Sequence, residues 1–234
     1  MNLATLQRLN AARRAREAVA LVTDLAGGAS RVVREGDLGQ DPLAGELAGR
    51  FASGASGVVA GPGGQAFVTV YLPPPRLVMI GAVHISQGLA PVAKLAGFDV
   101  AIIDPRTAFA TRERFADVPL IAEWPDDALP RVGLDRYTAL AALTHDPKID
   151  DGAIVAALRA GCFYVGALGS SRTHAKRLDR LRTLGLDDQQ LGRIRAPIGL
   201  AIGAQSPAEI AVAIAAEVIA AWRNRDSAAE EAAA

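Results

Sequence analysis

The three histidines of this 234-residue chain are the first candidates for chemistry. His84, His145 and His174 each lie just beyond an apolar run. His145 stands next to Asp146, and an imidazole beside a carboxylate can act as an acid/base pair near neutral pH. Asp146 also precedes a proline, which is equally typical of a helix N-cap. None of the histidines has the H-E-x-x-H spacing of a zinc site, so we predict no protein-bound metal.

A second candidate is the glycine- and serine-rich segment that ends at Arg172. Gly166 and Gly169 favour a turn, and Ser170 and Ser171 offer hydroxyls at the start of a predicted helix. Backbone amides at a helix N-terminus bind anions, and the Arg172 guanidinium is a planar, permanently charged partner for phosphate. The same pattern is typical of an ordinary glycine turn with a serine N-cap. The segment therefore predicts either an anion site or a simple helix start.

A third segment, residues 81–86, resembles a dinucleotide-binding loop with two substitutions. The G-x-G-x-x-G pattern needs its second glycine so that the backbone can approach a pyrophosphate, and here that position is Val83. Ser86 replaces the third glycine. Asp104 ends the next apolar run, where an acid would bind a ribose hydroxyl. The residues alone leave two interpretations open, which are a dinucleotide site and a scaffold without nucleotide.

These segments share a position relative to the predicted elements. Continuous apolar runs, typical of strands buried on both faces, alternate with helical stretches, and this pattern indicates an α/β fold with a Rossmann-like, doubly wound, mostly parallel sheet. Ligands of such sheets bind beyond the carboxyl ends of the strands, where all the candidate segments would meet. The predicted strands are 76–82, 98–104, 118–124, 137–146 and 162–169, and the predicted helices are 84–97, 149–160, 170–184 and 207–223.

Three consecutive prolines at 73–75 separate this region from a smaller one, because prolines continue neither a helix nor a sheet. We predict a small N-terminal α+β domain over 1–72 and the Rossmann-like domain over 76–225. A flexible tail is predicted for 226–234. Within the first domain the expected elements are helices 3–16 and 42–51, a strand at 18–25, and a hairpin formed by 57–60 and 65–72.

Composition excludes several function classes. Twenty-five basic residues balance twenty-five acidic ones, so the chain lacks the positive surplus of a general nucleic-acid binder. Cys162 is the only cysteine, which excludes an intrachain disulfide and fits a cytoplasmic protein. Its place at the start of an apolar run indicates a core residue rather than a nucleophile. We expect no membrane span, because Glu209 and Glu217 interrupt the most apolar helix.

The candidate segments together resemble the XdhC/CoxF family, the xanthine dehydrogenase accessory proteins. The resemblance covers about 67–222 and rests on four blocks in the family's order and spacing. The blocks are GAVHISQGLAPVAKLAGFDVAIIDPR at 81–106, THDP at 144–147, YVGALGSSRTHAKRL at 164–178 and IRAPIGLAIGAQSPAEIAVAIAAEVIA at 194–220.

This resemblance implies a chaperone rather than a conventional catalyst. Its cargo would be molybdenum cofactor, a molybdopterin in its mononucleotide or dinucleotide form, which it protects during sulfuration. Delivery would be to the apoenzyme of a molybdenum hydroxylase of the xanthine dehydrogenase or carbon monoxide dehydrogenase type. A cysteine desulfurase would be a partner, and the family implies a homodimer.

The resemblance also suggests roles for the candidate residues. Arg106 and the loop at 166–172 would neutralise phosphate. His84, His145 and Asp146 would contact the pterin or the ligands of the metal. The full expected binding set is Gly81, His84, Asp104, Arg106, His145, Asp146, Gly166, Gly169, Ser170, Ser171 and Arg172.

The chain departs from the family pattern at three places. Val83 replaces the second glycine of the family's G-A-G-H loop, and Ala201 replaces the acid of G-L-D-I-G-A. The cysteine of S-G-G-C-V-E is missing, since the nearest segment, 53–57, reads SGASG. Two other functions stay open on these grounds, which are an NAD(P)-dependent oxidoreductase using the Rossmann crevice and a ligand-free adaptor for hydroxylase assembly.

Overall fold

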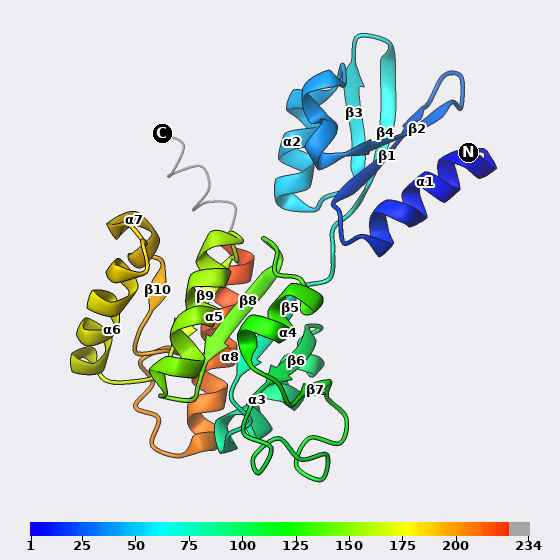
Figure 1. Cartoon of the computed structure of the whole chain (residues 1–234). Coiled ribbons are helices and arrows are strands. Elements are labelled where there is room, and N and C mark those ends of the chain that lie inside the picture. The colour runs from blue at the N-terminus through cyan, green and yellow to red at the C-terminus, as the bar shows by residue number, and fades with distance from the viewer. Residues whose placement is uncertain (225–234) are drawn as a thin grey trace. The chain divides into compact units, whose positions relative to one another are not determined.

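The computed structural model describes residues 1–224 and divides them into two units, one ending at Pro73 and the other beginning at Pro74 (Figure 1). The boundary lies within the three prolines, where no backbone amide can continue a ladder. The predicted tail at 226–234 lies outside the described residues.

The smaller unit is a four-stranded antiparallel sheet with the strand order β2-β1-β4-β3. Its strands are β1 (Val19–Asp24), β2 (Ser30–Arg34), β3 (Gly57–Gly61) and β4 (Gly64–Tyr71). The other elements are α1 (Leu3–Arg14), the 3-10 helix η1 (Glu35–Gln40) and α2 (Ala44–Ser53). Leu47 and Phe51 of α2 and Val19 and Val22 of β1 are fully buried. Strand β2, in which only Val33 is buried, was not predicted from the sequence.

The larger unit contains a six-stranded sheet in which every pairing is parallel. Its order is β10-β9-β8-β5-β6-β7. The strands are β5 (Arg76–Ile80), β6 (Asp99–Ile103), β7 (Leu120–Ile121), β8 (Thr138–Ala142), β9 (Tyr164–Ala167) and β10 (Ile194–Arg195). The predicted α/β class with a mostly parallel sheet and a small N-terminal α+β unit is thus confirmed.

Helices cover both faces of this sheet, as the continuous apolar strands require. One apolar core joins the sheet to α3 (His84–Leu95) and α8 (Pro207–Arg223). The other joins it to α4 (Pro125–Val132), α5 (Pro147–Arg159), α6 (Ser171–Thr183) and α7 (Asp188–Leu191). Within residues 1–224, no helix is long and apolar enough to cross a membrane.

The structure differs from the sequence expectation at several element boundaries. The predicted strand at 118–124 contains only two strand residues, Leu120 and Ile121. The helix α4 was not predicted, because two prolines and two adjacent aspartates hide its short apolar face. The helix α5 begins at Pro147 rather than at residue 149, since Asp146 caps it through the Lys148 amide.

Candidate functional site

The loops that follow β5 and β8 touch at the carboxyl edge of the larger sheet. The Leu143 amide donates to the Ile80 carbonyl at 2.8 Å. Gly81 has a φ of +118°, and a Cβ there would lie only 2.9 Å from Cγ2 of Thr144. Only glycine fits this approach. Because β6 and β8 flank β5 on opposite sides, these loops lie at the topological switch point, where open α/β sheets bind ligands.

Asp104, directly after β6, is fully buried and holds this edge together. Its carboxylate accepts from the Ala82 amide at 2.7 Å, and from the amide, Nε and Nη2 of Arg106 at 2.9, 2.9 and 2.7 Å. Burial opposes ionisation, but these bonds outweigh it and lower the pKa of Asp104 below its ordinary value. The carboxylate is therefore used by the protein's own donors and is not placed to bind a ribose hydroxyl.

The start of α3 is crossed by the segment that follows β6. Arg114 donates to the carbonyls of Ala82 and Phe109 at 3.0 and 2.9 Å and to Oε1 of Gln87 at 3.1 Å. Val83 occupies the N-cap of α3 with no side-chain cap, and the exposed His84 is the first helical residue. The Asp104 carboxylate already accepts from Ala82 and Arg106, and the Ala82 carbonyl accepts from Arg114. These contacts do not favour a dinucleotide at the loop that follows β5.

His145 and Asp146 connect β8 to α5 and have different tasks. Asp146 is the N-cap of α5 and accepts from the Lys148 amide at 2.9 Å. His145 is exposed and has a φ of +63°, an uncommon conformation for a residue with a side chain. Such backbone outliers concentrate at functional sites. The helix-cap interpretation of Asp146 is correct, and His145 faces a pocket.

The glycine- and serine-rich segment begins inside the sheet and ends in a helix cap. Gly166 is a strand residue of β9, and a Cβ there would lie 2.5 Å from the Tyr164 hydroxyl, so packing requires glycine. Gly169 turns the chain with a φ of +130°. The Ser170 hydroxyl accepts from the Thr173 amide at 3.3 Å and caps α6. The serine N-cap that the sequence indicated is therefore present.

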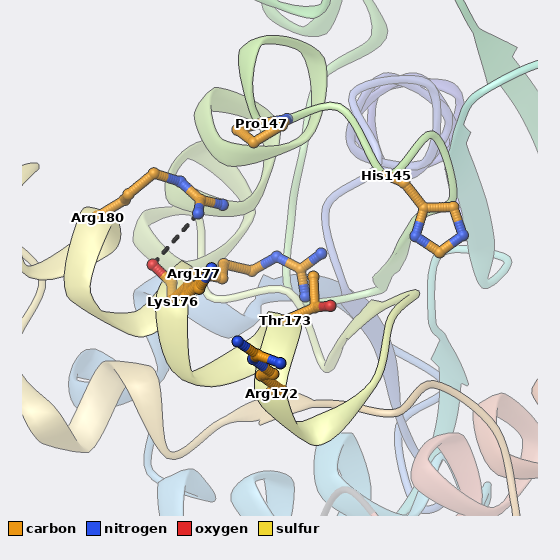
Figure 2. Close-up of a pocket in the computed structure, with 7 residues that line it drawn as sticks. All are labelled: His145, Pro147, Arg172, Thr173, Lys176, Arg177 and Arg180. Carbon is orange, nitrogen blue, oxygen red and sulfur yellow. Dashed lines mark hydrogen bonds between the residues drawn. The ribbon is translucent and has the colours of Figure 1, made fainter.

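The pocket itself lies between the start of α5 and one face of α6, and its volume is about 330 Å³ (Figure 2). It brings together two sequence-predicted residues, His145 and Arg172, with further residues that the sequence did not single out. Four of the seven lining side chains are basic and none is acidic. The lining residues are His145, Pro147, Arg172, Thr173, Lys176, Arg177 and Arg180.

Two acidic residues of α5 lie behind this lining. Asp151 forms a fork with Arg180, whose Nε and Nη2 donate to its two oxygens at 2.6 and 3.1 Å. Asp150 is buried and accepts from the Thr144 hydroxyl at 2.7 Å. Burial raises the pKa of Asp150 to about 6, against the opposing effect of Thr144 and of the charge on Arg177. A sequence signal for both residues was available, because two adjacent aspartates stand close before the apolar run 153–158 of this helix.

Other candidate residues do not line the pocket. Among the described residues, no group of three histidine, cysteine or acidic side chains could hold a metal ion.

Cys162 is fully buried, and burial raises the pKa of its thiol to about 12, so it is a core residue as the sequence indicated. His174 is partly buried on α6, where burial and the charge on Arg177 lower the pKa of its imidazole.

Comparison with known proteins places this architecture in a family. The family model described as the XdhC Rossmann domain matches residues 77–218, which include the switch-point loops and the pocket. The chain belongs to this family. The resemblance drawn from the four sequence blocks is thereby confirmed.

Relatives of this XdhC domain include three curated bacterial proteins. The uncharacterized Escherichia coli protein YqeB is 33% identical over 73% of this chain and 32% of its own length. A Bacillus subtilis protein, named as a probable xanthine dehydrogenase subunit, is 31% identical over 65% of this chain and 44% of its own length. The E. coli molybdenum cofactor insertion chaperone PaoD is 32% identical over 65% of this chain and 42% of its own length. The chain thus spans less than half the length of each relative.

A solved structure shares the fold of the XdhC chain. The crystal structure of a xanthine dehydrogenase from Bacillus halodurans matches with a TM-score of 0.68 and covers 96% of this chain and 68% of its own. Sequence identity is 23%, so the match establishes the fold alone.

Proposed function

We propose that this XdhC-family chain is a chaperone that binds molybdenum cofactor, protects it during sulfuration and delivers it to a molybdenum hydroxylase. The observation that carries the proposal is the basic pocket containing His145 and Arg172, at the sheet edge where Rossmann-like domains bind ligands. The name of PaoD as a molybdenum cofactor insertion chaperone supports the same function.

The proposed cargo fits the chemistry of this edge. Molybdenum cofactor carries a phosphate, or a pyrophosphate in its dinucleotide form, and a pocket with four basic side chains offers the charge that such a group needs. Arg172 would neutralise the phosphate, and His145 and His84 would hydrogen-bond the pterin. Gly81, Asp104 and Gly166 would shape the loops, and the remaining binding residues are Arg106, Asp146, Gly169, Ser170 and Ser171.

The partners follow from the proposed task. The chain would bind the apoenzyme of a molybdenum hydroxylase, of the xanthine dehydrogenase or carbon monoxide dehydrogenase type, and a cysteine desulfurase that supplies sulfur. We propose that it acts as a homodimer in the cytoplasm. The name of the B. subtilis relative, which refers to xanthine dehydrogenase, supports the hydroxylase partner.

The test is to purify the chain from cells that make the cofactor, oxidise it and measure the fluorescent pterin product. We expect pterin with the natural chain and less with Arg172→Ala. The control is Arg182→Ala on the same helix, because Arg182 pairs with Asp179 and Asp188 outside the pocket lining. The proposal fails if no pterin is found and added cofactor does not bind.

Two parallel measurements separate the competing functions. Titration with NADH and NADPH would reveal an oxidoreductase, and micromolar binding with substrate turnover would replace the proposal. Co-purification with a hydroxylase polypeptide but without pterin would instead identify a ligand-free adaptor.

A further inference from the structure

Arg177 is a buried cation whose hydrogen-bonding capacity is largely unused. Its residue exposure is 2%, and it lines the pocket between α5 and α6. Nη2 donates to the Leu168 carbonyl at 2.9 Å, but within residues 1–224 the Nε and Nη1 groups have no hydrogen-bond partner. Buried polar groups are normally satisfied, so unused donors on a buried guanidinium indicate a missing acceptor.

The neighbouring acids do not supply that acceptor. The nearest Asp151 oxygen lies 4.0 Å from Nε of Arg177, and both oxygens of Asp151 already accept from Arg180. Asp150 lies close enough to affect the pKa of Arg177, but its Oδ2 is itself buried without a partner. Burial lowers the pKa of Arg177, and the two aspartates only partly oppose this effect. The floor of the pocket, formed by Arg177, therefore offers unused N–H donors on a positively charged guanidinium.

The rim of the pocket adds charge of the same sign. Arg172, Lys176 and Arg180 are spaced four residues apart, so they lie on one face of α6, one turn above another. Arg172 and Lys176 are exposed, and neither has an ion-pair partner in the described part of the chain. Figure 2 shows the Arg177 side chain extending past Thr173 in the direction of His145. Arg177 at the floor and Arg172 and Lys176 at the rim thus line the same pocket of about 330 Å³.

We propose that this face of α6 is a phosphate-binding site in which Nη1 of Arg177 donates to a phosphate oxygen while Lys176 and Arg172 neutralise its charge from the rim. A phosphoryl group fits better than a carboxylate, because three converging cations match a dianion. The site lies further along α6 than the N-terminus, where the Ser170 hydroxyl already occupies the Thr173 amide. The inference rests on the proposed function only for the molecule that carries the phosphate.

Calorimetric titration of the full chain with inorganic phosphate and with pyrophosphate tests this site. We expect both anions to bind, and Arg177→Met to weaken binding by about tenfold to a hundredfold, the value of one charged hydrogen bond. Methionine fills the space of the arginine stem, and Asp151 keeps its fork with Arg180. Buried Asp150 loses the positive charge of Arg177, so its pKa should rise further and the residue should become neutral. Arg182→Met is the matched control and should bind both anions like the natural chain.

A rim variant keeps the test decisive if Arg177→Met does not fold. Lys176→Met changes an exposed residue, and it should weaken phosphate binding severalfold and reduce its salt dependence. No phosphate binding by the natural chain, or unchanged affinity in the pocket variants, would overturn the site. Phosphate binding by a chain that neither co-purifies with pterin nor binds added cofactor would keep the site and remove the proposed function. Pterin retention that Arg177→Met leaves unchanged would do the reverse.

Discussion

Replacement of Asp104 by asparagine tests the central role given to this buried carboxylate. The aspartate accepts four hydrogen bonds, three of them from Arg106. If the asparagine oxygen keeps the Arg106 amide and Nε as donors, its NH₂ group faces the Ala82 amide and Arg106 Nη2, so two bonds are lost. A hydrogen bond to a charged group contributes about 1.5–3 kcal/mol. Arg106 is 32% exposed and recovers part of its hydration, so we expect a loss of about 3 kcal/mol.

Urea unfolding followed by tryptophan fluorescence measures the free energy of unfolding of the larger unit, which contains Asp104. Both tryptophans, Trp124 and Trp222, belong to this unit. The folded pKa of Asp104 is lowered, so its contribution is present above the unfolded pKa of about 3.9 and is lost as the pH falls through the folded value. The difference should therefore be constant between about pH 5 and pH 8. Asp179→Asn, at an exposed position, is the control. A change within about 0.5 kcal/mol for Asp104→Asn would refute the reasoning.

Two further predictions concern buried titratable groups of the larger unit. Because burial raises the pKa of Asp150 to about 6, its contribution to stability is largest at low pH and is lost as the pH rises through that value. Asp150→Asn should therefore gain about 3 kcal/mol in stability relative to the natural chain between pH 4 and pH 7, and a constant difference in urea unfolding would contradict this. Cys162 should react with a disulfide reagent at pH 8 only when urea unfolds the chain, since its thiol is fully buried with a pKa raised to about 12. Rapid labelling of the native chain would contradict this burial.

The sequence predicted the larger sheet well because its strands are buried on both faces and read as continuous apolar runs. It predicted the short elements poorly. Strand β10 has two residues, and α4 carries two prolines, so neither has a long periodic pattern. These elements are fixed by tertiary packing against the sheet rather than by their own residues.

The candidate site was predicted in part for a related reason. His145 and Arg172 could be selected because each follows a predicted strand, and strand ends meet at one edge. Arg177 lies one and a half turns inside α6, where a charged residue in the sequence resembles any solvated helix position. Its burial depends on how α6 packs against α5, which no local pattern contains.

The central position of β5 has a consequence for the order of folding during synthesis. This strand is the first of its sheet to leave the ribosome, yet its neighbours β6 and β8 lie on either side of it. The sheet must therefore grow outward from its earliest strand in both directions, and α6 can dock on α5 only after β9 has been added. Because α8 supplies part of one apolar core and follows α6 in the chain, we expect the proposed anion-binding face between α5 and α6 to form before that core is closed.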